Sequence, residues 1–238
     1  MEIFNWSYAA EVFPTIFRAM FVTLGITLAS FAVALVLGLI LTLLRRSPVK
    51  IIAYLTYGFI EFVRGTPVLV QLFFVYFAWP LVPVIGFEMS AMTAGISTLG
   101  IHYSTYLSEI YRSGIESVDQ GQWEASRALN FSKAKTWTKI ILPQAVPPVI
   151  PMLGNYLIVL FKETPLLMAI SVNEMLMTAR NLGSQVFSFV EVYTIVGLLF
   201  LLLSYPSSLF VGYMERRMNT RYMRKAKVQK MKKEDVIS

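Results

Sequence analysis

Three polar side chains interrupt residues 51–79, one of the most apolar stretches of the sequence. Glu61, Arg64 and Gln71 stand at offsets of 0, 3 and 10 residues. At about 100° per residue in a helix, these positions share one narrow arc of the helix surface. Charges at membrane depth are costly, and they usually face a bundle interior or water. The arc therefore predicts either a hydrophilic pathway for a polar solute, to which Thr66 also belongs, or a purely structural Glu61–Arg64 ion pair.

A second polar stripe follows residues 90–111, and it contains the single histidine of the chain. The stripe consists of Thr98, His102, Thr105, Glu109 and Arg112, at offsets of 0, 4, 7, 11 and 14 residues. His102 is interpreted either as a hydrogen-bonded packing residue or as a proton relay. Since no second histidine extends a relay or a ligand set, we expect no metal site.

A third polar group, Lys162–Glu163–Thr164, ends the apolar stretch 141–161. It places a cation, an anion and a hydroxyl together after a proline-rich helix. Irregular backbone at membrane depth is tolerated where it lines a cavity, and a zwitterionic solute would suit this mixed lining. The alternative is an interfacial cap in which the Lys162 ammonium reaches back to the membrane surface.

The composition places these residues in an integral membrane protein of the all-α class. Hydrophobic residues make up 56% of the chain and the mean hydropathy is +0.60, which is well above a soluble domain of this length. A helix needs roughly 20 apolar residues to cross a bilayer. We predict about five spans and, because of Pro143, Pro147, Pro148 and Pro151, a bent or broken entry to the fourth. The predicted spans are 19–44, 51–79, 90–111, 141–161 and 192–214.

The distribution of lysine and arginine predicts the orientation. Placing residues 45–50, the polar stretch 112–140 and the tail 215–238 on one side collects 17 of the 21 positive residues. That side is therefore expected to be the cytoplasm. Residues 1–17 are expected to lie outside the cell and to precede a transmembrane domain at 18–214. The basic tail is explained by a cytoplasmic membrane flank, and no nucleic-acid partner is expected.

Several functions lack their residues in this chain. Cysteine is absent, so no disulfide framework or cysteine metal site is expected. The sequence has no phosphate-binding loop of the form G-x-x-x-x-G-K-[ST] and no G-x-S-x-G nucleophile turn. We therefore expect no catalysis by this chain and no ATP bound by it, and any driven transport would take its energy from another subunit or an ion gradient.

The longest polar passage, residues 119–144, predicts a docking element. Residues 120–129 form a short helix pattern with Gly121 near its start and Asn130 just past its end, where asparagine tolerates a left-handed conformation. Trp123, Ala125, Ala128 and Leu129 are expected to present an apolar surface to a partner. Ser132 is expected to cap a second helix, 133–142. The alternative is a helical hairpin that merely lies on the membrane.

This passage resembles the EAA motif of the permease subunits of type I ABC importers. The similarity rests on Glu124–Ala125–Ser126, on Asn130 and on Ile140–Ile141–Leu142–Pro143. Residues 61–67 and 118–125 are similar to the polar amino acid branch of that family. Residues 162–167 are more similar to ectoine and hydroxyectoine permeases. Ser126 and Asn130 stand where the family pattern has alanine and glycine.

The resemblance implies two ATPase subunits docked on residues 120–129, a second permease subunit, an extracytoplasmic solute-binding protein and a location in the bacterial inner membrane. It implies that ATP and Mg²⁺ are used by the partner ATPase. The implied coupling residues are Gly121, Glu124, Ala125, Ser126, Asn130, Ile140, Leu142 and Pro143. The candidate solute pathway comprises Glu61, Arg64, Thr66, Gln71, His102, Lys162, Glu163 and Thr164. The solute implied is a polar amino acid or a compatible solute such as ectoine.

Two other classes of function stay open at this point. A proton-coupled secondary transporter or channel would use Glu61, His102 and Glu109 as its proton path. It would take up solute without any other subunit. A membrane scaffold would transport nothing in any combination.

Overall fold

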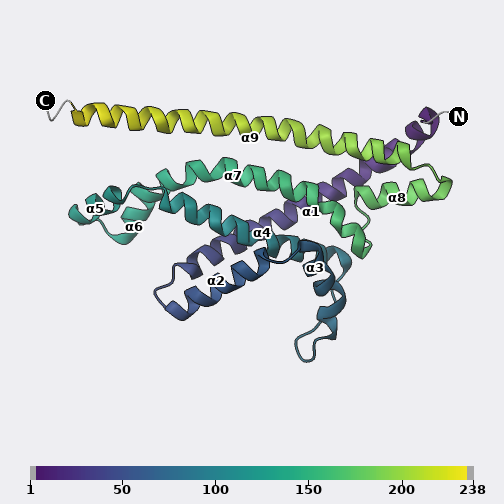
Figure 1. Ribbon diagram of the computed structural model, residues 1–238, viewed down its shortest axis with the longest axis horizontal. Helices are drawn as coiled ribbons and strands as arrows, with labels where there is room; N and C mark the ends of the chain where they lie inside the picture. Colours follow the sequence, from purple (N-terminus) through teal and green to yellow (C-terminus); the bar gives the residue numbers. More distant parts are fainter. Residues whose placement is uncertain (1–3, 235–238) are drawn as a thin grey trace. The chain divides into compact units, whose positions relative to one another are not determined.

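The computed structural model describes residues 4–234, with side chains up to Met218, and every regular element in that range is helical. The predicted all-α class is thereby confirmed (Figure 1). The α-helices are α1 (Trp6–Arg45), α2 (Lys50–Arg64), α3 (Val68–Phe73), α4 (Ala91–Glu116), α5 (Gln120–Ala128), α6 (Lys133–Thr136), α7 (Leu142–Glu163), α8 (Met175–Val186) and α9 (Phe189–Glu234). Wider π turns follow α3 and α6, at Phe74–Ala78 and Trp137–Ile141, and 3-10 turns occupy Trp79–Leu81 and Thr164–Ile170.

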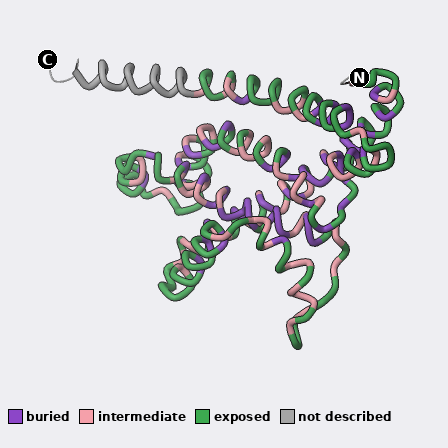
Figure 2. Tube along the Cα trace, turned by 45° about the vertical axis from the view of Figure 1, so that its right-hand side comes forward, coloured by how far each residue is buried: buried purple, intermediate pink, exposed green. Residues whose placement is uncertain are grey.

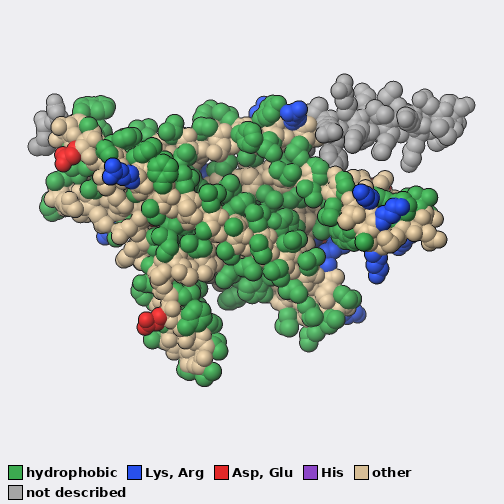
Figure 3. Space-filling view, turned by 180° about the vertical axis from the view of Figure 1, so that it is seen from behind, with side chains coloured by type: hydrophobic (Ala, Val, Ile, Leu, Met, Phe, Trp, Pro, Cys, Tyr) green, Lys and Arg blue, Asp and Glu red, His purple; other side chains and the backbone are tan. Residues whose placement is uncertain are grey.

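Three helical segments are long and apolar enough to cross a membrane: Trp6–Arg45, Lys133–Ile170 and Phe189–Met218. A fourth arises if α2 and the segment Val68–Leu81, which meet at 102°, count as one span. Large apolar side chains stay exposed along these helices, as on α9 at Leu198, Leu202 and Phe210. Figures 2 and 3 show this exposed and largely hydrophobic surface, which is expected where lipid replaces water.

Helix α4 is not among the helices that are apolar enough to cross a membrane, although the sequence predicts a span at 90–111. The reason lies in its buried face, which carries His102, Ser104, Thr105 and Ser108, all less than a tenth exposed. Polar residues of membrane helices are usually turned toward the protein interior in this way. The crossing of the membrane by α4 stays a prediction.

Two expectations about helix ends need correction. Helix α1 begins at Trp6, so most of the segment 1–17 is helical and continues directly into the first span. Helix α7 runs without a break through Pro147, Pro148 and Pro151, so of the expected bent or broken entry the break is absent at these residues. The irregularity lies just before α7, in the π turn at Trp137–Ile141. Most of the basic tail, beyond Met218, lies outside the described side chains.

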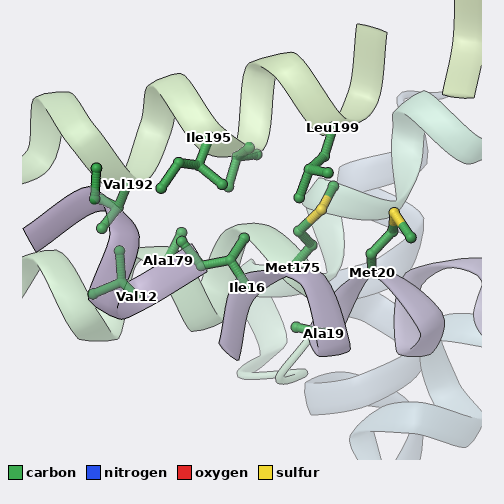
Figure 4. Packing of buried hydrophobic residues seen from close by; sticks show 11 residues of the cluster. Val12, Ile16, Ala19, Met20, Met175, Ala179, Val192, Ile195 and Leu199 are labelled. Carbon is green, nitrogen blue, oxygen red and sulfur yellow. The ribbon is translucent and has the colours of Figure 1, made fainter. Parts of the chain in front are cut away.

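The chain divides into two compact units, and helices α4, α7 and α9 contribute residues to both. The first comprises residues 1–109 and 156–205, and the second comprises residues 110–155 and 206–238. A hydrophobic core of the first unit joins α1, α8 and the start of α9. Figure 4 shows Ile16, Ala179 and Ile195 among the side chains that meet there.

A close crossing joins α1 to α4 within the first unit. A Cβ atom on Gly38 would lie 2.9 Å from the Ser104 carbonyl oxygen and 3.0 Å from the Leu107 Cβ, so only glycine fits without displacement. One turn later, the Thr42 hydroxyl lies 2.8 Å from the Gly38 carbonyl and 3.1 Å from the Ser108 carbonyl. Arg45 then pairs with Glu109. Small residues and hydroxyls are the usual means of close helix packing in membranes.

A buried carboxylate begins α8. The Glu174 side chain is completely buried and accepts hydrogen bonds from the backbone N–H groups of Leu176 (2.9 Å) and Met177 (2.7 Å). The Met175 N–H donates to the Thr23 hydroxyl at 3.1 Å, which ties α8 to α1. Burial raises the pKa of Glu174, and its hydrogen bonds act in the opposite direction.

The crossing at Gly38 generates a first prediction. Gly38→Leu should lower the free energy of unfolding by about 1–3 kcal/mol, since it forces α1 and α4 apart. Gly25→Leu on the same helix is the matched control, because a Cβ atom there would meet nothing within 4 Å. Thermal unfolding in detergent measures both variants. Equal midpoints of thermal unfolding for Gly38→Leu and Gly25→Leu would show that α1 and α4 are not closely packed at Gly38.

Glu174 generates a second prediction, on pH. Because its pKa in the folded protein is raised above the usual value of 4.5, its contribution to stability is complete below pH 4.5 and decreases as the pH rises through the raised value. Wild type should therefore lose thermal stability as the pH is raised above 4.5, relative to Glu174→Gln, which keeps an acceptor oxygen and does not titrate. Parallel stability curves for the two proteins would contradict the assignment.

Candidate functional site

Helix α5, the predicted docking helix, is defined at both ends by capping interactions within the second unit. The Asp119 carboxylate accepts a hydrogen bond from the Gly121 N–H at 2.7 Å, which starts the helix. At its end, the Asn130 N–H bonds to the Arg127 carbonyl and the Phe131 N–H bonds to the Ser126 carbonyl, both at 3.0 Å. These two bonds form a Schellman motif, whose left-handed position is Asn130 at φ 54°. The expected left-handed asparagine is thus present.

One face of α5 packs inward. The Trp123 indole lies edge-on against Trp137, with ring centroids 5.2 Å apart, and both rings pack on a small core of Val118, Ile141 and Ala145. Ile140 is half-buried against the same core. Ser126 is buried as well, and its hydroxyl donates to the Gln122 carbonyl at 2.6 Å. The expectation that Trp123 faces a partner is therefore wrong, because its ring is needed to hold α5 in place.

The opposite face of α5 is exposed. It presents Glu124, Ala125, Arg127, Ala128 and Leu129, of which Leu129 is 66% exposed. Small side chains beside one exposed leucine leave room for the close approach of another protein. Figure 3 shows Lys and Arg side chains gathered over the α5–α6 segment, as the sequence predicts for a cytoplasmic surface.

The predicted second helix is present, with an irregular end. The Ser132 hydroxyl accepts from the Lys135 N–H at 3.3 Å and caps α6, as expected. The helix is α-helical only over Lys133–Thr136, and the π turn then leads directly into α7. Leu142 and Pro143, the last residues of the motif, are exposed at the start of α7.

The candidate solute pathway lies in the first unit and begins at the break between α2 and α3. A bend of 102° at residues 65–67 frees backbone carbonyls that a straight helix would satisfy. The Gln71 amide nitrogen donates to the Val63 carbonyl (2.7 Å), the Thr66 carbonyl (3.2 Å) and the Thr66 hydroxyl (2.7 Å). The Thr66 hydroxyl also lies 3.0 Å from the Phe62 carbonyl. Gln71 and Thr66 therefore hold the bend.

His102 connects this bend to α4. Its Nδ1 atom lies 3.1 Å from the Gln71 amide oxygen. Because the amide nitrogen of Gln71 already donates to carbonyls, its oxygen must face His102, and the Nδ1–H group must donate. The buried imidazole therefore has a defined tautomer and a structural partner.

Arg64 lies at the end of α2, among aromatic rings of α4 and α7. Its guanidinium carbon is 5.2 Å from the centroid of the Tyr106 ring, and its Nη1 atom is 3.7 Å from the Glu61 carboxylate. Tyr106 in turn lies 6.0 Å from Tyr103 and 5.6 Å from Tyr156 between ring centroids. These three tyrosines were not predicted as site residues. Tyr103 and Tyr106 flank the polar stripe of α4, whereas Tyr156 is brought in only by the fold.

The three residues at the end of α7 have different environments. The Lys162 side chain is exposed, and Glu163 is half-buried and interacts electrostatically with Tyr103. Thr164 is completely buried, and its hydroxyl donates to the Phe161 carbonyl at 2.7 Å. Thr164 is therefore occupied in ending the helix, whereas Lys162 and Glu163 keep side chains that are at least partly accessible.

Comparison with known proteins places this arrangement in a family. The model of the binding-protein-dependent transport system inner membrane component matches residues 34–220. A probable amino-acid ABC transporter permease of Sinorhizobium fredii is 39% identical over 205 residues, which covers 86% of this chain and 87% of that protein. The glutamine transport system permease of Escherichia coli K12 is 32% identical over 215 residues, with 90% and 98% covered.

A solved structure agrees with these relatives. The crystal structure of an amino acid ABC transporter with histidines has a chain that is 31% identical, with a TM-score of 0.83 over 90% of this chain and 99% of that one. With the match to 34–220, this shows that the chain belongs to the family of binding-protein-dependent transport system inner membrane components.

Proposed function

We propose that the chain is the membrane-spanning permease subunit of an ATP-driven importer for a polar amino acid or a zwitterionic compatible solute. The family match over residues 34–220 carries this proposal. Relatives named for amino-acid and glutamine transport support the solute class. Two ATPase subunits, a second permease subunit and an extracytoplasmic binding protein complete the importer, which resides in a bacterial inner membrane with the N-terminus outside. ATP and Mg²⁺ belong to the ATPase subunits.

In this proposal, α5 transmits the movement of the ATPase to the membrane helices. Its exposed face, with Glu124 and Ala125, enters a groove of the ATPase. A helix that transmits movement must be rigid. Helix α5 is capped by Asp119 at one end and by the Schellman motif at Asn130 at the other. The contact between Trp123 and Trp137 holds its inner face against residues that lead into α7. Closure of the ATPase pair then moves α5 and its neighbours as one body.

The solute proposal is narrower and depends on the polar group in the first unit. Arg64 lies beside Tyr106, and its positive charge suits the carboxylate of a zwitterion. Similarity of residues 162–167 to ectoine and hydroxyectoine permeases adds these cyclic zwitterions to the candidates. A screen of the cognate binding protein with polar amino acids and ectoine distinguishes them.

Nothing in the family match favours the proton-coupled alternative. His102 is engaged with Gln71, and Glu109 is paired with Arg45 on α1. Uptake by the purified chain alone in liposomes, driven by a pH gradient, would nevertheless establish that alternative.

Charge reversal on the docking face gives a third prediction. Glu124→Arg should abolish ATP-driven uptake and co-purification of the ATPase, because an exposed anion of the contact surface becomes a cation. Glu215→Arg, which reverses another exposed carboxylate of the second unit, should leave both intact. Persistence of both activities in Glu124→Arg would show that α5 is not the docking helix.

The helix end gives a fourth prediction. Asn130→Val should destabilise the Schellman motif by roughly 1–2 kcal/mol, since a β-branched residue is strained at a positive φ. ATP-driven uptake should fall while the chain remains in the membrane. Asn130→Gly should retain or raise uptake, because glycine adopts φ 54° without strain. Equal uptake by the two variants would show that this end of α5 need not be rigid.

A further inference from the structure

Arg64 is held weakly for a charged residue of a membrane helix. Its ion pair with Glu61 spans one helical turn at 3.7 Å, which is longer than a hydrogen bond, and both side chains are more than a third exposed. Its other described contact is the face of Tyr106, at 5.2 Å from the ring centroid. Neither contact satisfies the planar, forked donors of the guanidinium, which match a carboxylate.

The Tyr106 ring, by contrast, is held firmly. Tyr156 packs against it from α7 at 5.6 Å, and the His102 ring lies 5.3 Å away on the same helix. Tyr103, which is 5% exposed, packs behind at 6.0 Å. Tyr106 itself is only half-buried. A rigid, partly accessible aromatic face that already holds a cation is a cation-binding surface.

We propose that Tyr106 binds the cationic group of the transported solute and that Arg64 occupies this face until a solute carboxylate draws its guanidinium away. This inference rests on the importer function proposed above. The carboxylate of an entering zwitterion pairs with Arg64, and its cation takes the place of the guanidinium on the ring. The positive charge of Arg64 therefore has a partner at both stages, first the Tyr106 ring and then the solute carboxylate. This matters because an unpaired charge is costly in a membrane.

The exchange selects the chemical class of the solute. An aromatic face favours weakly hydrated cations, such as alkylated ammonium or delocalised amidinium groups, over a compact primary ammonium. A solute also needs a carboxylate, because a cation alone would leave Arg64 without an anion. The favoured class is therefore a small zwitterion whose cation is alkylated or delocalised.

The test measures affinities of the purified permease–ATPase complex in nanodiscs, without binding protein. The probes are trimethylglycine, glycine, ectoine and tetramethylammonium. Wild type should bind trimethylglycine and ectoine roughly tenfold more tightly than glycine. Tyr106→Phe should keep this preference, because the ring face remains. Tyr106→Leu should lose it, whereas Tyr205→Leu, at an exposed tyrosine of α9, should not.

Arg64→Ala provides the readout that a merely structural role would not produce. It should weaken binding of trimethylglycine and strengthen binding of tetramethylammonium, because the ring is then uncovered and no carboxylate partner remains. Unchanged tetramethylammonium affinity in Arg64→Ala, or an unchanged preference in Tyr106→Leu, overturns the inference. ATP-driven uptake by the complete wild-type importer separates the two proposals. If the importer takes up solute but the variants show none of these effects, only the cation site is refuted. If the complete importer takes up neither an amino acid nor ectoine in the presence of ATP, the proposed importer function is refuted.

Discussion

The arrangement of the first unit depends on one requirement: backbone N–H and C=O groups that are shielded from water need hydrogen-bond partners within the protein. A straight helix satisfies itself, but the bend of 102° between α2 and α3 leaves carbonyls without N–H partners. The Gln71 side chain replaces those partners, and its remaining oxygen accepts from His102 on α4. One amide thus joins three helices. Since α2 ends at the bend, Arg64 is left beside Tyr106 at that point. Gln71, His102 and Arg64 thus lie close to the bend because the bend needs the hydrogen bonds of the first two and ends the helix that carries the third.

Small and hydroxyl-bearing residues bring the helices of this unit close together. Gly38 and Thr42 permit α1 to approach the backbone of α4, and Glu174 and Thr23 join α8 to α1. Many large apolar side chains are nevertheless exposed on the outer surface (Figure 3), beside the apolar core that joins α1, α8 and α9. Such exposure is tolerated in lipid, because apolar side chains gain little by leaving lipid for the interior, whereas polar groups gain partners there.

The second unit contains a helix of only nine residues, α5, which needs support from outside its own hydrogen bonds. Isolated helices of this length are unstable, so α5 depends on its caps and on one aromatic contact. Asp119 and Asn130 supply the caps, and Trp123 supplies the contact with Trp137. None of these contacts uses Glu124 or Ala125, whose side chains stay exposed.

The sequence by itself determined the helical class, the apolar segments, the end of α5 and the start of α6, because these depend on local hydropathy and on residues such as Asn130 and Ser132, whose preferences are local. It also identified Arg64, Gln71 and His102 as residues that need partners. Only the tertiary structure decided which partners they have. Trp123 is apolar on either face of α5, and only its packing against Trp137 shows which face is inward. Likewise the continuity of α7 through its prolines, and the approach of Tyr156 to Tyr106, depend on helix packing, which a pattern along one chain does not specify.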